Sequence, residues 1–236
     1  MLTRVDHVMI CVPDLARGID AYQRLGFNIY PGGAHTGRAT HNAIAFTGDE
    51  YIEVLSIRDR SAVAPGTADE GLARYLDAGG GFRVIALQSD DLEADVAAMR
   101  RRGVDVGEIR DGGRRTPAGQ ELRWRAAFPG PSVPLPIFFI QHLTPLEERR
   151  PREARVGHPN GVLGTDRVYE TLNRGDKWVA ISKPDVNGWD ADLPNGTAAP
   201  IDWVAVSPSN PDVIYATAGA TGYRASDRAI RLRRKS

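Results

Sequence analysis

Two apolar stretches near the start of the chain decide its fold: Val5-Asp6-His7-Val8-Met9-Ile10-Cys11-Val12-Pro13-Asp14-Leu15 and Tyr51-Ile52-Glu53-Val54-Leu55-Ser56-Ile57. The first alternates as a strand does and stops at Pro13. Asp14 then suits a helix N-cap, because its carboxylate accepts hydrogen bonds from free backbone N–H groups. Apolar residues at helical spacing predict a helix that ends at Gly26. Strands at residues 42–46 and 51–57 follow, so residues 5–57 predict a β-α-β-β-β unit.

The same plan repeats further along the chain. Residues 82–88 predict a strand, Ser89-Asp90-Asp91 a helix cap, and residues 122–128 and 137–143 later strands. Leu92 falls on Leu15 and Gly103 on Gly26 at one offset without a gap. Such self-similarity indicates two copies of one supersecondary unit. The fold class is therefore α+β, with modules at residues 1–57 and 82–143 in a domain of residues 1–143.

Several ordered motifs then show a resemblance to a known family. They are Asp6-His7-Val8, Val12-Pro13-Asp14-Leu15, Gly32-Gly33-Ala34-His35-Thr36-Gly37, Thr40-His41-Asn42 and Tyr51-Ile52-Glu53. Together they resemble the glyoxalase-like branch of the vicinal oxygen chelate superfamily. The resemblance implies paired modules whose mixed sheet curls around a shared cleft, and a divalent metal ion that accepts two vicinal oxygens of a small substrate.

The first module supplies the leading candidates for metal ligands, His7 and Glu53. Imidazole and carboxylate are ligands that divalent metals accept, although a hydrogen-bonded strand histidine is the plain alternative for His7. In the second module Val84 falls on His7 and cannot bind a metal. Either Gln141 or His142 lies near the position that matches Glu53, and Gln141 is the predicted third ligand. The donor types do not distinguish Zn, Fe, Mn, Ni and Mg.

Residues around the glycine-rich turn are expected at the rim of the cleft. His35 and His41 are candidate acids or bases, since histidine titrates near neutral pH, and Asn42 is a candidate substrate contact. In the matching strand of the second module Trp124 and Arg125 are further candidates, because arginine binds carboxylates in a bidentate manner. Being adjacent, these two face opposite ways, and we expect Trp124 in the core with the arginines outside.

The last third of the chain differs from the two modules in its composition and residue patterns. Residues 144–160 form a proline-bounded charged run, which predicts a solvated linker or a short surface helix. The residues Asn173, Gly175 and Trp178 fit an Asp-box pattern, so residues 161–227 resemble a blade of a sortilin-like or neuraminidase-repeat β-propeller, in an all-β C-terminal segment. The basic residues 228–236 predict a disordered tail. A chimeric or truncated chain, or a natural fusion, would explain this combination.

Composition limits the partners. Thirty basic residues balance thirty acidic ones, so we expect neither a nucleic acid nor a membrane as a partner. The single Cys11 excludes an internal disulfide and fits a buried thiol. No secretory signal or membrane span is evident, which leads us to expect a cytoplasmic protein with a small-molecule substrate; a homodimer is also considered.

Three hypotheses of function follow. The first is a metal-dependent enzyme of the glyoxalase-like class, with lyase, isomerase or dioxygenase chemistry left open. The second is a metal-free protein that binds or sequesters a small molecule in the same cleft, which Val84 favours. The third is an interaction protein whose blade fragment completes another chain's propeller.

Overall fold

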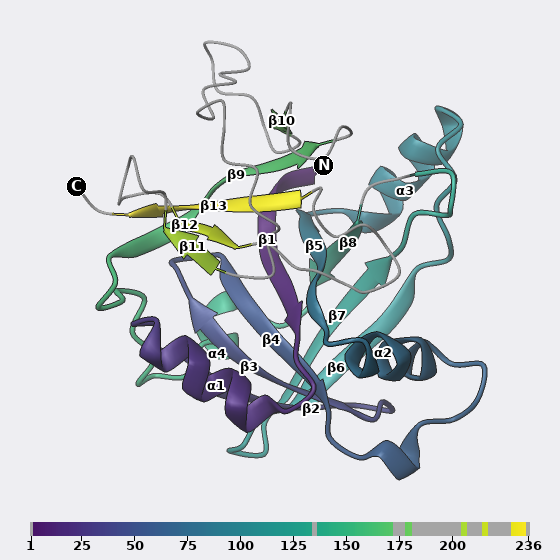
Figure 1. Cartoon of the computed structure of the whole chain (residues 1–236). Helices are drawn as coiled ribbons and strands as arrows, with labels where there is room; N and C mark the ends of the chain where they lie inside the picture. Colours follow the sequence, from purple (N-terminus) through teal and green to yellow (C-terminus); the bar gives the residue numbers. More distant parts are fainter. Residues whose placement is uncertain are drawn as a thin grey trace.

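The computed structural model describes residues 2–133, 136–171, 178–180, 204–206, 214–216 and 228–234. Two β-α-β-β-β modules follow one another along the chain (Figure 1). The first contains β1 (Leu2–Cys11), α1 (Leu15–Arg24), β2 (Tyr30–His35), β3 (Thr40–Phe46) and β4 (Tyr51–Ile57). The second contains β5 (Gly81–Ser89), α3 (Leu92–Arg101), β6 (Arg110–Arg115), β7 (Glu121–Ala127) and β8 (Ile137–His142). Between them lie the short helix η1 (Arg60–Ala62) and α2 (Ala68–Asp77).

The helix boundaries follow the predicted local signals. The Asp14 carboxylate accepts from the Arg17 N–H at 3.0 Å and caps α1. In the second module the cap is Asp91, which accepts from the Ala94 N–H at 3.0 Å. Gly26 and Gly103 follow the two helices with φ angles of 81° and 79°, a conformation that other residues adopt only at a cost. The duplicated plan is therefore confirmed at both ends of each helix.

The eight strands of the two modules form one closed barrel in the order β1-β4-β3-β2-β6-β7-β8-β5. Two antiparallel seams join the modules, β1 with β5 and β2 with β6. Within each module the first and last strands are parallel, β1 with β4 and β5 with β8. The mixed, curled sheet is as predicted, and it closes completely. Helix α1 packs outside β3 and β4, and α3 packs outside β7 and β8.

Strands β2 and β6 were not identified from the sequence, because each contains a Gly-Gly pair that usually marks a turn. Their glycines let neighbouring side chains lie against the backbone. A Cβ on Gly32 would lie 2.1 Å from Asn42 Oδ1, and a Cβ on Gly112 would lie 2.3 Å from Trp124 Nε1. The glycines of both strands therefore make room inside the barrel for a side chain from the next strand.

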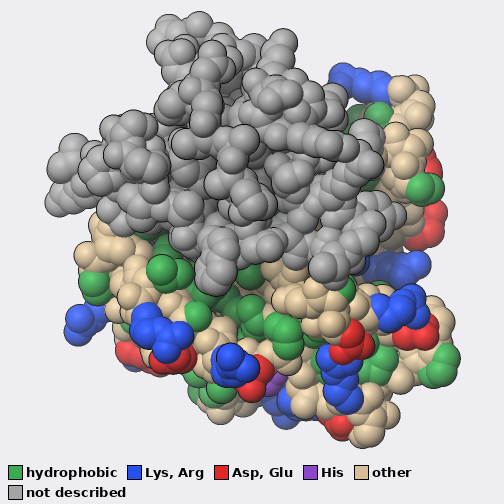
Figure 2. Space-filling model, in the orientation of Figure 1, with side chains coloured by type: hydrophobic (Ala, Val, Ile, Leu, Met, Phe, Trp, Pro, Cys, Tyr) green, Lys and Arg blue, Asp and Glu red, His purple; other side chains and the backbone are tan. Residues whose placement is uncertain are grey.

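The main apolar core lies between the barrel and α1. It includes Val8, Leu15, Tyr22, Val54 and Ile85, all buried. On the described part of the face that Figure 2 shows, positive and negative side chains are interspersed, in line with the balanced composition. None of the described helices has the length and apolar character needed to cross a membrane.

Of the two alternatives predicted for residues 144–160, a solvated linker and a short surface helix, the structure shows the helix. The segment contains α4 (Leu146–Arg149), and both Arg149 and His158 are buried. His158 Nδ1 accepts from the Asn28 N–H at 3.0 Å, and its ring lies 5.2 Å from that of Phe27. Asn160 Nδ2 donates to Leu25 O at 2.8 Å beside the end of α1. The segment is therefore held against the first module by hydrogen bonds to the loop that follows α1 and by a hydrogen bond from the charged Arg150 to Gly48 O.

Beyond it, β9 (Val162–Thr171), β10 (Trp178–Ala180), β11 (Val204–Val206), β12 (Ile214–Ala216) and β13 (Arg228–Arg234) form a sheet in the order β10-β9-β13-β12-β11. The predicted disordered tail is wrong for residues 228–234, since β13 pairs with β9 and β12. Asn173 and Gly175 of the expected Asp-box lie outside the described residues, and Trp178 begins β10.

We predict that His158→Ala lowers the free energy of unfolding by about 1–3 kcal/mol, because it leaves the Asn28 N–H without an acceptor and removes the contact with Phe27. Urea denaturation measures the change. Arg152→Ala, an exposed position in the same segment, is the control and should change the stability by less than about 0.5 kcal/mol. Equal effects of the two substitutions would mean that the segment does not contribute to the core.

Candidate active-site cavity

The barrel encloses a cavity of about 700 Å³ that all eight strands line. Strand alternation selects the lining residues, because every second side chain of a strand points inward. On β1 these are His7, Met9 and Cys11, on β3 Thr40, Asn42, Ile44 and Phe46, and on β4 Tyr51, Glu53 and Leu55. The second module contributes apolar side chains, among them Val84, Leu122, Trp124, Phe138 and Ile140, and also charged ones such as Arg83, Arg110 and Arg114.

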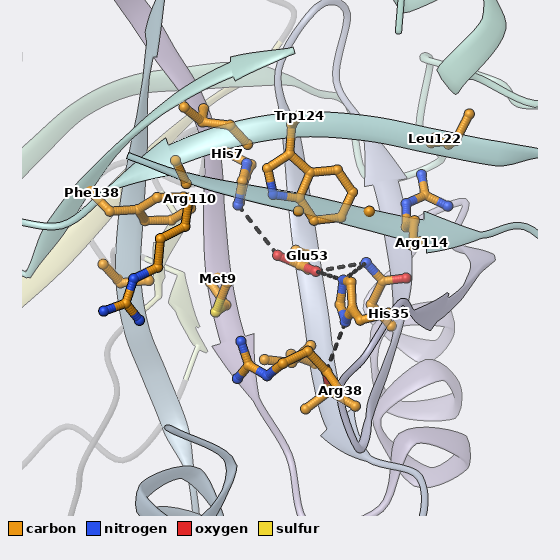
Figure 3. Close-up of a pocket in the computed structure, with 18 of the residues that line it drawn as sticks. His7, Met9, His35, Arg38, Glu53, Arg110, Arg114, Leu122, Trp124 and Phe138 are labelled. Carbon is orange, nitrogen blue, oxygen red and sulfur yellow. Dashed lines mark hydrogen bonds and ion pairs between the residues drawn. The ribbon is translucent and has the colours of Figure 1, made fainter. Parts of the chain in front are cut away.

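Glu53 is the polar centre of the cavity (Figure 3). Its side chain is nearly inaccessible to solvent, and three neighbours surround the carboxylate. Asn42 Nδ2 donates to Oε1 at 2.6 Å, His7 Nε2 lies 3.3 Å from Oε2, and His35 Nε2 lies 3.6 Å from Oε1. Burial opposes ionisation of Glu53, but His7, His35 and Asn42 outweigh it and lower its pKa to about 2. The carboxylate is therefore ionised at neutral pH.

His7 is oriented by its neighbour in the sequence. A bulge in β1 between Val5 and His7 places the fully buried Asp6 beside the ring, and His7 Nδ1 donates to Asp6 Oδ1 at 2.7 Å. The ring stacks on Tyr51 at 4.5 Å between centroids. Burial alone would lower the pKa of His7, but the carboxylates of Asp6 and Glu53 raise it to about 9. His7 is therefore an imidazolium between two carboxylates.

His35 lies on the other side of Glu53 and differs in charge. Its Nδ1 is 2.9 Å from Thr40 Oγ1, and its ring meets Trp124 edge-on at 5.9 Å. Burial is the main reason that the pKa of His35 falls to about 4, and the nearby arginines Arg114 and Arg38 contribute, against the opposing effect of Glu53. The cavity thus holds a neutral imidazole and a charged one on opposite sides of one carboxylate.

Five of the eight predicted site residues line this cavity: His7, His35, Asn42, Glu53 and Trp124. The other three lie elsewhere. His41 points away from the lining positions Thr40 and Asn42 on the same strand. Gln141 donates to Asp90 O at 2.7 Å and accepts from the Leu92 N–H at 3.3 Å, outside the barrel at the start of α3.

Arg125 binds Glu93 on the outside, with Nη2 2.6 Å from Oε2. Its adjacent residue Trp124 faces inward, as alternation required. The predicted roles of His41, Gln141 and Arg125 at the cleft are therefore corrected: each is on the face of its strand that points away from the cavity.

Sequence reasoning missed several cavity residues. His142, which was weighed against Gln141, is the one that lines the cavity, and its Nε2 faces Asp6 Oδ2 at 3.0 Å. Strand parity with the apolar Ile140 would have selected His142 over Gln141. Arg114 lies on an unrecognised strand and Arg149 in the supposed linker, so no sequence signal pointed to either of them.

The sequence model of the family described as "Glyoxalase-like domain" matches residues 5–183. The chain belongs to this family. The match confirms the resemblance seen in the motifs, and it runs past the predicted domain boundary at residue 143. It includes the positions of the expected Asp-box, so neither the match nor the described strands support the interpretation as a propeller blade.

Several solved structures resemble parts of this glyoxalase-like protein. A hypothetical protein from Staphylococcus aureus matches with a TM-score of 0.51 and 21% identity over 61% of each chain, so the match spans about three fifths of that protein's length. A methylmalonyl-CoA epimerase variant from Streptomyces coelicolor, in complex with 2-nitronate-propionyl-CoA, matches with a TM-score of 0.46 and 23% identity, over 61% of this chain and 100% of the other. The Mycobacterium tuberculosis methylmalonyl-CoA epimerase gives 0.45 and 22%, over 62% and 93%. No curated protein matches significantly.

Superfamily members commonly bind divalent metals, and His7 and Glu53 of this glyoxalase-like protein could supply part of such a site. His7 and Glu53 are adjacent, and Asp6 orients His7 as second-sphere carboxylates orient metal-binding histidines. His142, however, is directed to Asp6, and Val84 has no donor atom. Among the described residues, no three His, Cys, Asp or Glu side chains are arranged to hold one ion. The residues present therefore do not complete a metal site.

We predict that the stability of the protein falls as the pH rises through about 9. The raised pKa of His7 means that the charged form is favoured in the fold, so its contribution is complete below the ordinary value of 6.5 and is lost near 9. Chemical denaturation between pH 6 and 10 measures this. His7→Gln should remove that part of the dependence, and an unchanged pH profile in the variant would contradict the assignment.

We also predict that Gly112→Ala displaces Trp124, because the new Cβ would lie 2.3 Å from Nε1 and 2.6 Å from Cε2. The expected cost is about 1–3 kcal/mol, with a shifted indole N–H resonance in NMR spectra. Gly71→Ala in α2 is the matched control, since nothing lies within 4 Å of the added Cβ. It should leave Trp124 unchanged and be neutral or stabilising; an unmoved Trp124 resonance in Gly112→Ala would refute the prediction.

Proposed function

We propose that this glyoxalase-like protein binds a small organic molecule inside its barrel, at Glu53, without a metal ion held by both modules. One observation carries the proposal. In the second module Val84 stands at the position that corresponds to His7 of the first, and His142 faces Asp6. The second module therefore offers few donors for a metal ion, and its apolar side chains form a surface for an organic ligand. This corresponds to the binding hypothesis drawn from the sequence.

The cavity suits such a ligand in size and in the distribution of its polar groups. Its volume of about 700 Å³ lies in the usual range of small-molecule sites. The polar groups Glu53, His7, His35 and Asn42 converge near the middle, and most of the remaining wall is apolar. Such a wall takes up the hydrocarbon part of a ligand, while the few convergent polar groups fix its orientation.

A metal-dependent enzyme remains the second candidate, because one feature favours it. His7 Nε2 is buried and has no well-aligned hydrogen-bond partner among the described residues, although it lies 3.3 Å from Glu53 Oε2. A buried nitrogen in this position beside a carboxylate is what the first module of a metal site would need. The missing third donor places this candidate second.

Metal content and ligand binding together distinguish the two candidates. We expect the purified protein to hold less than stoichiometric divalent metal and to bind a cavity ligand equally well with and without a chelator. A ligand at about one hundred times its Kd should raise the melting temperature by roughly 5–10 °C. Stoichiometric metal that His7→Ala and Glu53→Ala both remove would instead favour the metal-dependent enzyme.

A filled cavity provides the control for the site of binding. Met9→Trp adds bulk to a lining position and should abolish the ligand-induced rise in melting temperature. Leu163→Trp, at an exposed position, should leave it intact. Ligand binding that survives Met9→Trp would place the ligand outside the barrel and contradict the proposal.

A further inference from the structure

Two buried arginines line the inner end of the cavity, and neither has a role in the proposed binding site so far. Arg114 comes from β6 and Arg149 from α4, and each is only 8% exposed. Their neighbours in the lining include Phe46, Tyr51 and Leu122. A guanidinium in such surroundings stays charged, because its pKa is too high for deprotonation. A buried charge without an opposite charge is costly.

Neither guanidinium has a carboxylate partner. Among the described residues, no Asp or Glu oxygen lies within 4.0 Å of a nitrogen of Arg114 or Arg149, whereas Arg38 and Arg125 both make such pairs. Arg114 Nη1 donates to Gly32 O, which is a neutral acceptor. The nearest candidates for counter-charges are already engaged: Asp6 by His7 and His142, and Glu53 by Asn42 and His7.

Arg149 is the less satisfied of the two. Its Nη1 lies 3.1 Å from His142 Nε2, but that nitrogen also faces the carboxylate of Asp6 at 3.0 Å. One ring nitrogen cannot donate to Asp6 and accept from Arg149 at once. The Nε atom of Arg149 is buried and has no hydrogen-bond partner in the described structure. The side chain of Arg149 is therefore only partly satisfied within the described fold, and the residue lines the cavity.

The two guanidinium groups also lie close enough to influence each other. Burial lowers the pKa of Arg114, and the charge of Arg149 lowers it further, while Glu53 acts in the opposite direction. Burial raises the pKa of Tyr51 and keeps its phenol neutral, although the charges of Arg149 and Arg114 act in the opposite direction. The inner end of the cavity thus combines two like charges with a neutral hydroxyl group, which favours an anion between them.

We propose that Arg114 and Arg149 bind the carboxylate of a small organic acid, whose apolar part lies in the barrel. This inference rests on the proposed function, because it assigns one subsite within the same cavity. The planar fork of a guanidinium matches the two oxygens of a carboxylate. The apolar neighbours Phe46 and Leu122 suit the hydrocarbon of an organic acid better than a hydrated inorganic ion.

The cavity also has exposed arginines that would assist entry of an anion. Arg83 and Arg110 line it and are exposed, and Figure 3 shows Arg110 and Arg38 on the side of Glu53 away from Leu122. Arg83 lies over the ring of Tyr75 at 4.9 Å. Within the described part of the chain neither Arg83 nor Arg110 forms an ion pair, and the carboxylates Glu108 and Asp111, which also line the cavity, offset part of the positive potential of these arginines.

Binding of matched acids and amides tests the subsite. The probes are phenylacetate, hexanoate and benzoate, their uncharged amides, and inorganic phosphate, followed by saturation-transfer NMR and by thermal shift on the full chain. We expect each acid to bind more tightly than its amide. Arg114→Gln and Arg149→Gln should weaken acid binding by about tenfold or more and leave amide binding nearly unchanged. Phosphate should not compete with the acids.

The control is Arg115→Gln, at the next position of β6, which is exposed and lies near Glu121. It should keep wild-type preference for acids. If Arg114→Gln does not fold, Arg149→Gln and the wild-type comparison of acid with amide still decide the question. Amides that bind as tightly as acids, acid binding unaffected by Arg149→Gln, or competition by phosphate would overturn the carboxylate subsite while the cavity remained a binding site. Absence of binding by acids and amides alike would overturn the proposed function as well.

Discussion

The negative charge of Glu53 is enclosed by the barrel, so groups that also lie inside the barrel have to balance it. In this protein those groups come from the first module. Three different strands supply these groups: β1 supplies His7, β2 supplies His35 and β3 supplies Asn42. Each is an inward position of its strand, so a register shift by one residue would leave the charge alone in an apolar interior. The register of these strands and the ionised state of Glu53 therefore depend on each other.

The two modules have the same order of strands and helix but contribute different side chains to the cavity. The first supplies a carboxylate and two imidazoles of unequal charge, and the second supplies mainly an apolar wall with Trp124, Val84 and Phe138. Closure by the seams β1–β5 and β2–β6 brings these unlike halves together around one cavity. The segment after β8 then adds Arg149, so the inner end of the cavity depends on residues outside both modules.

Much of the fold could be predicted from local signals. Helices α1 and α3, their caps and their terminal glycines follow from spacing and from the chemistry of Asp and Gly. Strands β2 and β6 could not be found in this way, because a Gly-Gly pair locally indicates a turn, and the contacts of Gly32 with Asn42 and of Gly112 with Trp124 form only once the neighbouring strands pair. The burial of Arg149 and His158 within the charged run before β9 could not be predicted from local signals either, since it depends on surfaces made by other elements.

For the site, the sequence by itself determined which residue types were present in the first module and that His7, His35, Asn42 and Glu53 lay in strands or turns of one unit. Strand alternation could also have placed His142 inside and Gln141 outside. Only the tertiary structure decided that β1 carries a bulge at Asp6, that the sheet closes, and that Arg114 and Arg149 line one cavity. These features arise from pairing between strands far apart in the chain, and no local stretch of residues determines the free energy of such pairing.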